Sequence, residues 1–244
     1  MNSEPKRLII SLVAVVAVGI GGLALSRIRP AATQAQEAYA PVIRPADFVG
    51  RVDNRYFPLA PGTTFVSRGA GSGATETMVV TGETKTIMGV KTTQVRDREV
   101  NKNNELIEDT YDWYAQDKNG DVWYFGEDTT VYKHGQAVSR AGSWEAGQGR
   151  ALPGIIMKKH PQVGESRRQE YSKGVAEDMA QVLGTTETVT VPAGTYTNCV
   201  KTKDWDARHP YPAEYKYYCP DAGVVLETPA VGLGRTELIS IRHK

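Results

Sequence analysis

Carboxylates are densest in one predicted hairpin. Glu108, Asp109 and Asp112 come before a turn at residues 118–120, and Glu127 and Asp128 follow it. Two carboxyl groups about 5–9.5 Å apart beside aromatic rings could hydrolyse a glycosidic bond. Acidic residues at a solvated strand end instead keep a sheet edge from pairing, and this arrangement is more common. We therefore expect a solvated acidic strand end, with no catalytic residue.

The remaining reactive residue types predict no catalytic or metal site. His134, His160, His209 and His243 are scattered and match no zinc-binding spacing. Residues 117–121 (DKNGD) resemble a calcium loop only faintly, because the glycine comes one place early and no Glu stands at the twelfth position. We expect no metal, no cofactor and no enzymatic activity.

The two cysteines are placed to face each other across a hairpin. Cys199 and Cys219 share a midpoint at His209, inside the turn-rich stretch DARHPYP. Folding the strands about this point sets Lys201 opposite Tyr217, and opposed strand residues can approach to disulfide distance. We predict a disulfide, which indicates export to an oxidising compartment. Two unrelated buried thiols are the alternative.

The hairpin at residues 111–128 carries aromatic residues on both faces. Asn119-Gly120 is typical of a tight turn, and the implied register sets Tyr114 opposite Tyr124 and Trp113 opposite Phe125. A solvated sheet face should be polar. We therefore expect one face in the core and the other covered by a loop, a ligand or a partner. The candidate contact residues in this hairpin are Tyr111, Trp113, Tyr114, Trp123, Tyr124 and Phe125.

Residues 145–164 break the rhythm of short strands. This stretch is rich in Gly and Pro and contains an apolar tip at Ile155, Ile156 and Met157. Long irregular loops are uncommon and often functional. We expect this loop to contact a partner or, alternatively, to cover the barrel end or the aromatic sheet face.

Short alternating runs separated by turn residues fill the chain from Phe48 onward. This pattern predicts an all-β domain, an antiparallel meander that forms either a barrel or a half-barrel. After residue 40, the one candidate helix is the short segment 174–183.

The N-terminus contains an apolar stretch at residues 8–26. It is nearly long enough to span a bilayer as one transmembrane helix, and Arg27 and Arg29 follow it directly. A cleaved signal peptide is the alternative to a retained anchor. We divide the chain into an anchor or signal segment (1–29), a linker (30–47) and an exported β domain (48–244). The expected location is the cytoplasmic membrane, with the β domain in the periplasm or outside the cell.

Several motifs resemble an uncharacterised family of exported bacterial proteins. They are NRYFPLAPGTTF, EDTYDWYAQDKNGDVWYFGED, GSWEAG, PGIIM, RQEY and GVAEDMAQVL, spread over about Val52 to Gly234. The segments TVTVPAGTYTNCVKTKDW and YKYYCPDAGVVLE together resemble a hairpin of open β-barrels of the lipoprotein-carrier kind. The resemblance implies export and an all-β fold, and it supplies no catalytic residue.

Three function classes are compatible with these sequence features. A net charge of +1 gives no electrostatic footprint for nucleic acid. We expect a non-enzymatic accessory subunit, anchored by residues 8–26 and docked on an integral membrane complex of respiratory, photosynthetic or secretion type. A carrier of a lipophilic small ligand is the alternative, and a carbohydrate-active hydrolase is the third interpretation.

Overall fold

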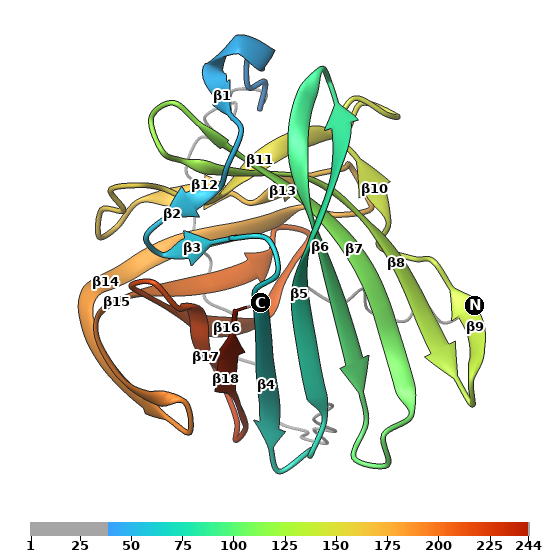
Figure 1. Cartoon of the computed structure of the whole chain (residues 1–244), viewed down its shortest axis with the longest axis vertical. Coiled ribbons are helices and arrows are strands. Elements are labelled where there is room, and N and C mark those ends of the chain that lie inside the picture. The colour runs from blue at the N-terminus through green and yellow to red at the C-terminus, as the bar shows by residue number, and fades with distance from the viewer. Residues whose placement is uncertain (1–38, 244) are drawn as a thin grey trace, which may run out of the picture.

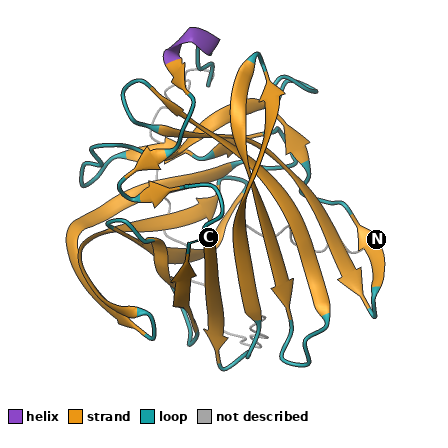
Figure 2. Cartoon of the chain, viewed as in Figure 1, coloured by secondary structure: helices purple, strands orange, loops and turns teal. Residues whose placement is uncertain are grey.

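The computed structural model describes residues 39–243, which form an almost purely β structure. The 3₁₀ turn η1 (Pro45–Asp47) is the one helical element among them (Figure 2). Within this range no helix has the length and apolar character needed to cross a bilayer. The apolar stretch 8–26, for which we predicted a transmembrane helix, lies outside the described residues.

The strands of the first half of the chain are β1 (Phe48–Val49), β2 (Asp53–Asn54), β3 (Phe57–Pro58), β4 (Thr64–Ala70), β5 (Thr75–Ile87), β6 (Val90–Val100), β7 (Leu106–Asp117), β8 (Val122–Lys133) and β9 (Gln136–Ser139). Those of the second half are β10 (Trp144–Glu145), β11 (Leu152–Met157), β12 (Ser166–Arg168), β13 (Glu170–Tyr171), β14 (Asp178–Val191), β15 (Gly194–Asp206), β16 (His209–Cys219), β17 (Gly223–Pro229) and β18 (Arg235–Arg242).

One long antiparallel sheet curls around a shared interior (Figure 1). Its strand order is β12-β14-β15-β16-β17-β18-β4-β5-β6-β7-β8-β11-β13, with β1, β9 and β10 attached beside this path. The path is open, so the predicted half-barrel describes it and the closed barrel is wrong. Its two end strands, β12 and β13, follow each other in the chain and are separated by Gln169 alone.

The strand β14 replaces the short helix considered at residues 174–183. It begins at Asp178 and pairs along its length with β15, where Val182 lies opposite Thr202. Pairing with a long neighbour gives most of this fourteen-residue strand backbone partners. A helix over this ten-residue segment would gain much less stabilisation, because isolated short helices are marginal in water.

A small hairpin formed by β2 and β3 crosses the front of the curled sheet (Figure 1). The Asn54 side-chain amide of this hairpin donates a hydrogen bond of 2.8 Å to the carbonyl of Gly120, which lies in the turn between β7 and β8. On the other side, the Asp221 amide donates to the Arg55 carbonyl at 2.7 Å. We call residues 52–59 the strap, because they join the two sides of the sheet over its interior.

The end of the predicted linker packs against the β domain. The Tyr39 hydroxyl donates to the Pro153 carbonyl at 2.8 Å, and its ring contacts that of Tyr171. Further along, the Lys118 amide donates to the Asp47 carbonyl. Residues 39–47 therefore belong structurally to the domain that follows them.

Candidate functional site

The β7–β8 hairpin places two tyrosines in the interior. Tyr114 lies opposite Tyr124, as the sequence register predicts, and their rings stack at 4.8 Å. Both side chains are buried, and the Tyr124 hydroxyl donates to Asp112 Oδ1 at 2.6 Å. These predicted contact residues therefore belong to the core and present no outer surface to a partner.

Other predicted pairs in this hairpin shift by one residue. Trp113 pairs with Gly126 instead of Phe125. The cause is a bulge at Gly126, whose φ of 142° and close approach to the Trp144 backbone leave no room for a side chain. In the turn between β7 and β8, Gly120 has a positive φ and Asn119 does not.

The aromatic outer face of the hairpin is covered by other parts of the same chain. Phe48 of β1 contacts Phe125 at 5.5 Å and Trp123 at 6.3 Å between ring centroids. The Lys85 ammonium lies 3.9 Å from the Trp113 ring centroid, and Arg96 lies over the Tyr111 ring. Of the three covers that we considered, a loop, a ligand or a partner, the structure shows other segments of the same chain on this face.

The apolar tip expected in the loop 145–164 forms strand β11. This strand pairs with β8, where Ile155 lies opposite Trp123. Ile156 and Met157 are buried, and Ile155 is half-buried. The segment therefore extends the sheet beside β8 instead of lying over its aromatic face, and an exposed contact loop at these residues is wrong.

A disulfide bond joins Cys199 and Cys219, as the shared midpoint predicts. The pairs Lys201–Tyr217 and Lys203–Tyr215 also have the predicted register. Both cysteines are fully buried and belong to the hydrophobic core, and the bond links β15 and β16.

The acidic residues of the hairpin divide between the two faces. Asp109 pairs with Arg96, and Asp128 pairs with Arg140, on the outside of the sheet. Asp112 is only 3% exposed and Glu127 only 9% exposed. The predicted solvated strand end is therefore wrong for these two carboxyl groups, which face the interior.

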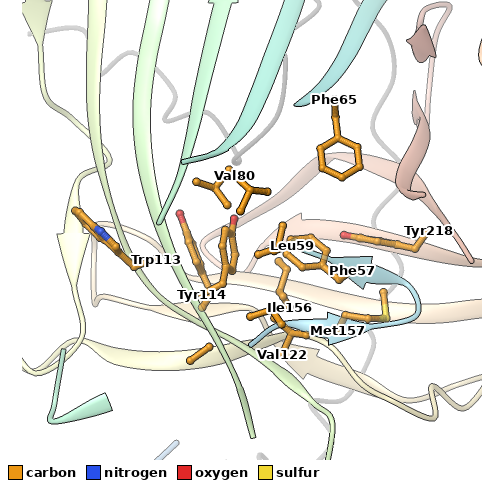
Figure 3. Close-up of a cluster of buried hydrophobic side chains, with 14 of the residues drawn as sticks. Phe57, Leu59, Phe65, Val80, Trp113, Tyr114, Val122, Ile156, Met157 and Tyr218 are labelled. Carbon is orange, nitrogen blue, oxygen red and sulfur yellow. The ribbon is translucent and has the colours of Figure 1, made fainter. Parts of the chain in front are cut away.

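An interior cavity of about 90 Å³ lies between the strap and the concave face of the sheet. In Figure 3, Phe57 and Leu59 of the strap lie between Tyr114 on one side and Tyr218 on the other. The cavity is lined by apolar and polar side chains in similar numbers. Its apolar lining includes Phe57, Leu59, Phe65, Met78, Tyr114, Ile156, Tyr218 and Val224, and its carboxyl lining is Glu76, Asp97, Asp112, Glu170, Asp178 and Glu227.

Several of these carboxyl groups have specific hydrogen-bond donors. The Trp144 indole donates to Glu170 Oε2 at 2.8 Å, and Tyr124 donates to Asp112. Glu170 and Asp178 also share a side-chain hydrogen bond, which requires a proton on one of them. Aromatic donors thus hold part of the acidic lining in place.

Burial shifts the titration of this lining toward the neutral form. It raises the pKa of Asp112 to about 7 against the opposing effect of the Tyr124 hydrogen bond, and it raises the pKa of Asp178 to about 6. Burial also raises the pKa of Asp97, with Glu76 adding to the shift, and that of Glu227, with Glu214 adding to it. Removing water from a carboxylate disfavours its charge, which explains the common direction.

Lys216 is the one basic side chain on the cavity lining in the part of the chain that the structure describes. Its Nζ lies 3.4 Å from Asp204 Oδ2 and 3.4 Å from Glu214 Oε1. Burial opposes its charge, but the surrounding negative groups outweigh that effect and raise the pKa of Lys216. The lysine is therefore a fixed cation that two carboxylates hold.

Two carboxyl oxygens on the cavity lining have no hydrogen-bond partner among residues 39–243. They are Glu227 Oε2 and Asp97 Oδ1, and both atoms are buried. Glu227 is 8% exposed as a whole residue. A buried polar atom left without a partner is costly, so each such group calls for an explanation.

Most of this lining could not be predicted from the sequence, because charged residues normally face solvent. Glu214, Lys216 and Tyr218 do occupy alternate positions of one predicted strand. That alternation was the available signal, since it places all three side chains on one face. Among residues 39–243, no three His, Cys, Asp or Glu side chains are arranged to hold a metal ion.

Comparison with family models and with curated proteins finds no match to this chain. Two solved structures resemble it. A Bacteroides fragilis protein, described as exported and as having a YmcC-like fold, has a TM-score of 0.46 and 14% identity, covering 76% of this chain and 98% of its own. A Parabacteroides distasonis protein described as a lipoprotein has a TM-score of 0.38 and 15% identity, covering 78% of this chain and 99% of its own.

Proposed function

We propose that this chain is an exported, non-enzymatic binding protein that holds a small lipophilic ligand in the cavity beneath the strap. The observation that carries the proposal is the mixed lining of the cavity, in which aromatic and aliphatic side chains alternate with a comparable number of polar ones. Small-molecule sites commonly combine an apolar wall with a small number of polar groups that orient the ligand.

The disulfide supports the exported location. A buried bond between Cys199 and Cys219 persists in an oxidising compartment and is rare in the cytosol. We further propose that residues 8–26 remain as a single-pass anchor in the cytoplasmic membrane. The binding domain would then work at the outer surface of that membrane.

We assign the buried carboxyl groups an electrostatic role and no catalytic one. Asp112 and Glu170 accept hydrogen bonds from Tyr124 and Trp144, which orient them. If the cavity instead hydrolysed a glycan, Asp112→Asn would abolish turnover in a glycan screen. That result would replace the binding function with the hydrolase interpretation.

Docking on an integral membrane complex of respiratory, photosynthetic or secretion type is the second candidate. One observation favours it: the turn between β17 and β18 presents Val231 and Leu233, which are 82% and 92% exposed. Exposed apolar side chains of this kind suit a protein interface. Replacing both with Asp should release the protein from such a complex without unfolding the domain.

Small-molecule analysis of protein purified from its native membranes tests the binding function. We expect organic extraction and mass spectrometry to recover a molecule in near-stoichiometric amount. Ser67→Phe should reduce its recovery, because Ser67 lines the cavity. Ser166→Phe is the matched control, since Ser166 is exposed on β12. Recovery of a larger assembly without any small molecule would favour docking instead.

A further inference from the structure

The charges that line the cavity are unbalanced. Six carboxyl side chains face it, but Lys216 is the single cation among its described lining residues. An acidic cluster alone does not make a binding site, because buried carboxyl groups can simply hold protons. A binding role requires, in addition, a buried polar group without a hydrogen-bond or ion-pair partner.

Glu227 is such a group. It lies opposite Lys216 in the register of β16 and β17, but the Lys216 ammonium forms its ion pairs with Asp204 and Glu214. Within the part of the chain that the structure describes, Glu227 Oε2 is buried and has no hydrogen-bond partner, while the side chain lines the cavity. Asp97, which also lines the cavity, has a second buried oxygen, Oδ1, without a hydrogen-bond partner among the described residues.

Three aromatic rings belong to the same cavity lining as these oxygens. Phe57 of the strap lies 5.1 Å from Tyr114 and 6.4 Å from Tyr218 between ring centroids, and all three rings line the cavity. Aromatic faces attract cations as well as apolar groups. The cavity lining therefore combines carboxyl groups that can ionise with rings that tolerate positive charge.

We propose that the ligand of this cavity is a small organic amine, whose ammonium group pairs with Glu227 and whose carbon skeleton packs against Phe57 and Tyr114. This inference rests on the proposed binding function and narrows it to a chemical class. A cavity of about 90 Å³ is somewhat smaller than the roughly 150 Å³ engineered cavity that holds benzene. This volume limits the size of the part of the amine that can be buried.

The titration of the lining agrees with a cationic ligand. The groups that face Glu227 are Glu76 of β5, Asp204 of β15, and Glu214 and Lys216 of β16, and together with burial they leave the pKa of Glu227 raised. An arriving ammonium group favours the charged carboxylate, so binding should release a proton. The affinity for the amine should therefore increase as the pH rises from 5.5 to 8.

The groups that face Asp97 act in the same direction. Glu76 of β5 shares a side-chain hydrogen bond with it, and Asp112 and Glu108 of β7 add negative charge. Burial and these neighbours raise the pKa of Asp97. A second ionisable acceptor on the same cavity lining would strengthen the preference for a cation.

Calorimetric titration of the full-length chain in phosphatidylcholine nanodiscs tests the inference. The probes are benzylamine and benzyl alcohol, which have nearly the same shape but differ in charge at pH 8. We expect the amine to bind at least about tenfold more tightly than the alcohol. Glu227→Gln should remove this preference, and Glu83→Gln, on an exposed residue of β5, should keep it.

The wild-type amine-to-alcohol ratio remains decisive even where Glu227→Gln does not fold. Equal or weaker binding of the amine would overturn the charge inference while leaving the cavity as a binding site. Failure of both probes, together with no small molecule on the native protein, would overturn the binding function as well. Glu227-dependent binding of Ca²⁺ without amine binding would assign the cavity to a metal ion and overturn the amine.

Discussion

Glu227 lies directly opposite Lys216 on neighbouring strands, yet the lysine forms its ion pairs with Asp204 and Glu214. Because the lysine is paired with these two residues, the buried Glu227 carboxyl group remains available to a cation from outside the chain. The curled sheet brings this group under the strap, where Phe57 closes the aromatic wall. This pairing pattern is the structural basis of the proposed ligand class.

The stability of the empty protein should fall as the pH rises from 5 to 8. The folded-state pKa of Asp112 is about 7, above its ordinary value of 3.8. The folded protein therefore holds a proton that the unfolded chain has released, and this contribution is lost as the pH rises toward 7. Asp112→Asn should make the decrease in the free energy of unfolding with pH shallower by about 1 kcal/mol per pH unit between pH 5 and 7. Urea unfolding followed by tryptophan fluorescence measures both slopes, and an increase of stability with pH would contradict the interior placement of these carboxyl groups.

Loss of the disulfide should destabilise the domain by about 3 kcal/mol, because the bond closes a twenty-residue loop. The double variant Cys199→Ala and Cys219→Ala is the direct test, measured by urea unfolding. Reduction of the wild-type protein controls for the loss of side-chain volume. A double variant as stable as the oxidised wild-type protein would show that the bond does not constrain the unfolded chain.

A charge on β11 should unfold the protein rather than release a partner. Ile156 is 7% exposed and lines the cavity, so Ile156→Asp would bury an unpaired carboxylate. We expect a loss of roughly 3 kcal/mol or more in the free energy of unfolding. Ile155→Asp, at the half-buried neighbouring position, should cost less. Thermal unfolding by circular dichroism compares the two, and equal melting temperatures would contradict the assigned faces of β11.

Removal of the Phe48 ring should expose the outer face of the β7–β8 hairpin. Phe48 contacts Phe125 and Trp123, and it is itself only partly buried. Phe48→Ala should cost about 1–3 kcal/mol, below the range for a fully buried Phe. Tryptophan emission should shift to the red as Trp123 gains solvent contact. An unchanged spectrum would mean that another part of the molecule covers this face.

The sequence predicts the parts of the fold that depend on local alternation. The β15–β16 register follows from evenly spaced strands around His209, and the Tyr114–Tyr124 pair follows from a short turn. The Trp113–Gly126 pair could not be predicted, because a bulge adds a residue to one strand without changing the apolar pattern.

The cavity depends on contacts between distant segments, which leave no periodic signal in the sequence. Phe48 covers the hairpin because β1 pairs with β7, and the strap covers the interior because hydrogen bonds hold it to Gly120 and Asp221. The acidic lining reverses the usual orientation of charged residues, so Asp112 and Glu127 were expected at a solvated strand end. Buried groups that break a general rule in this way are frequent at functional sites.

A crystal structure of the protein with benzylamine would show whether Glu227 and the aromatic wall hold an amine. We expect the phenyl ring between Phe57 and Tyr114, with the amine nitrogen within about 4 Å of Glu227 Oε2, the distance of an ion pair. A cavity filled by water alone, or a probe bound elsewhere on the molecule, would contradict the proposed site.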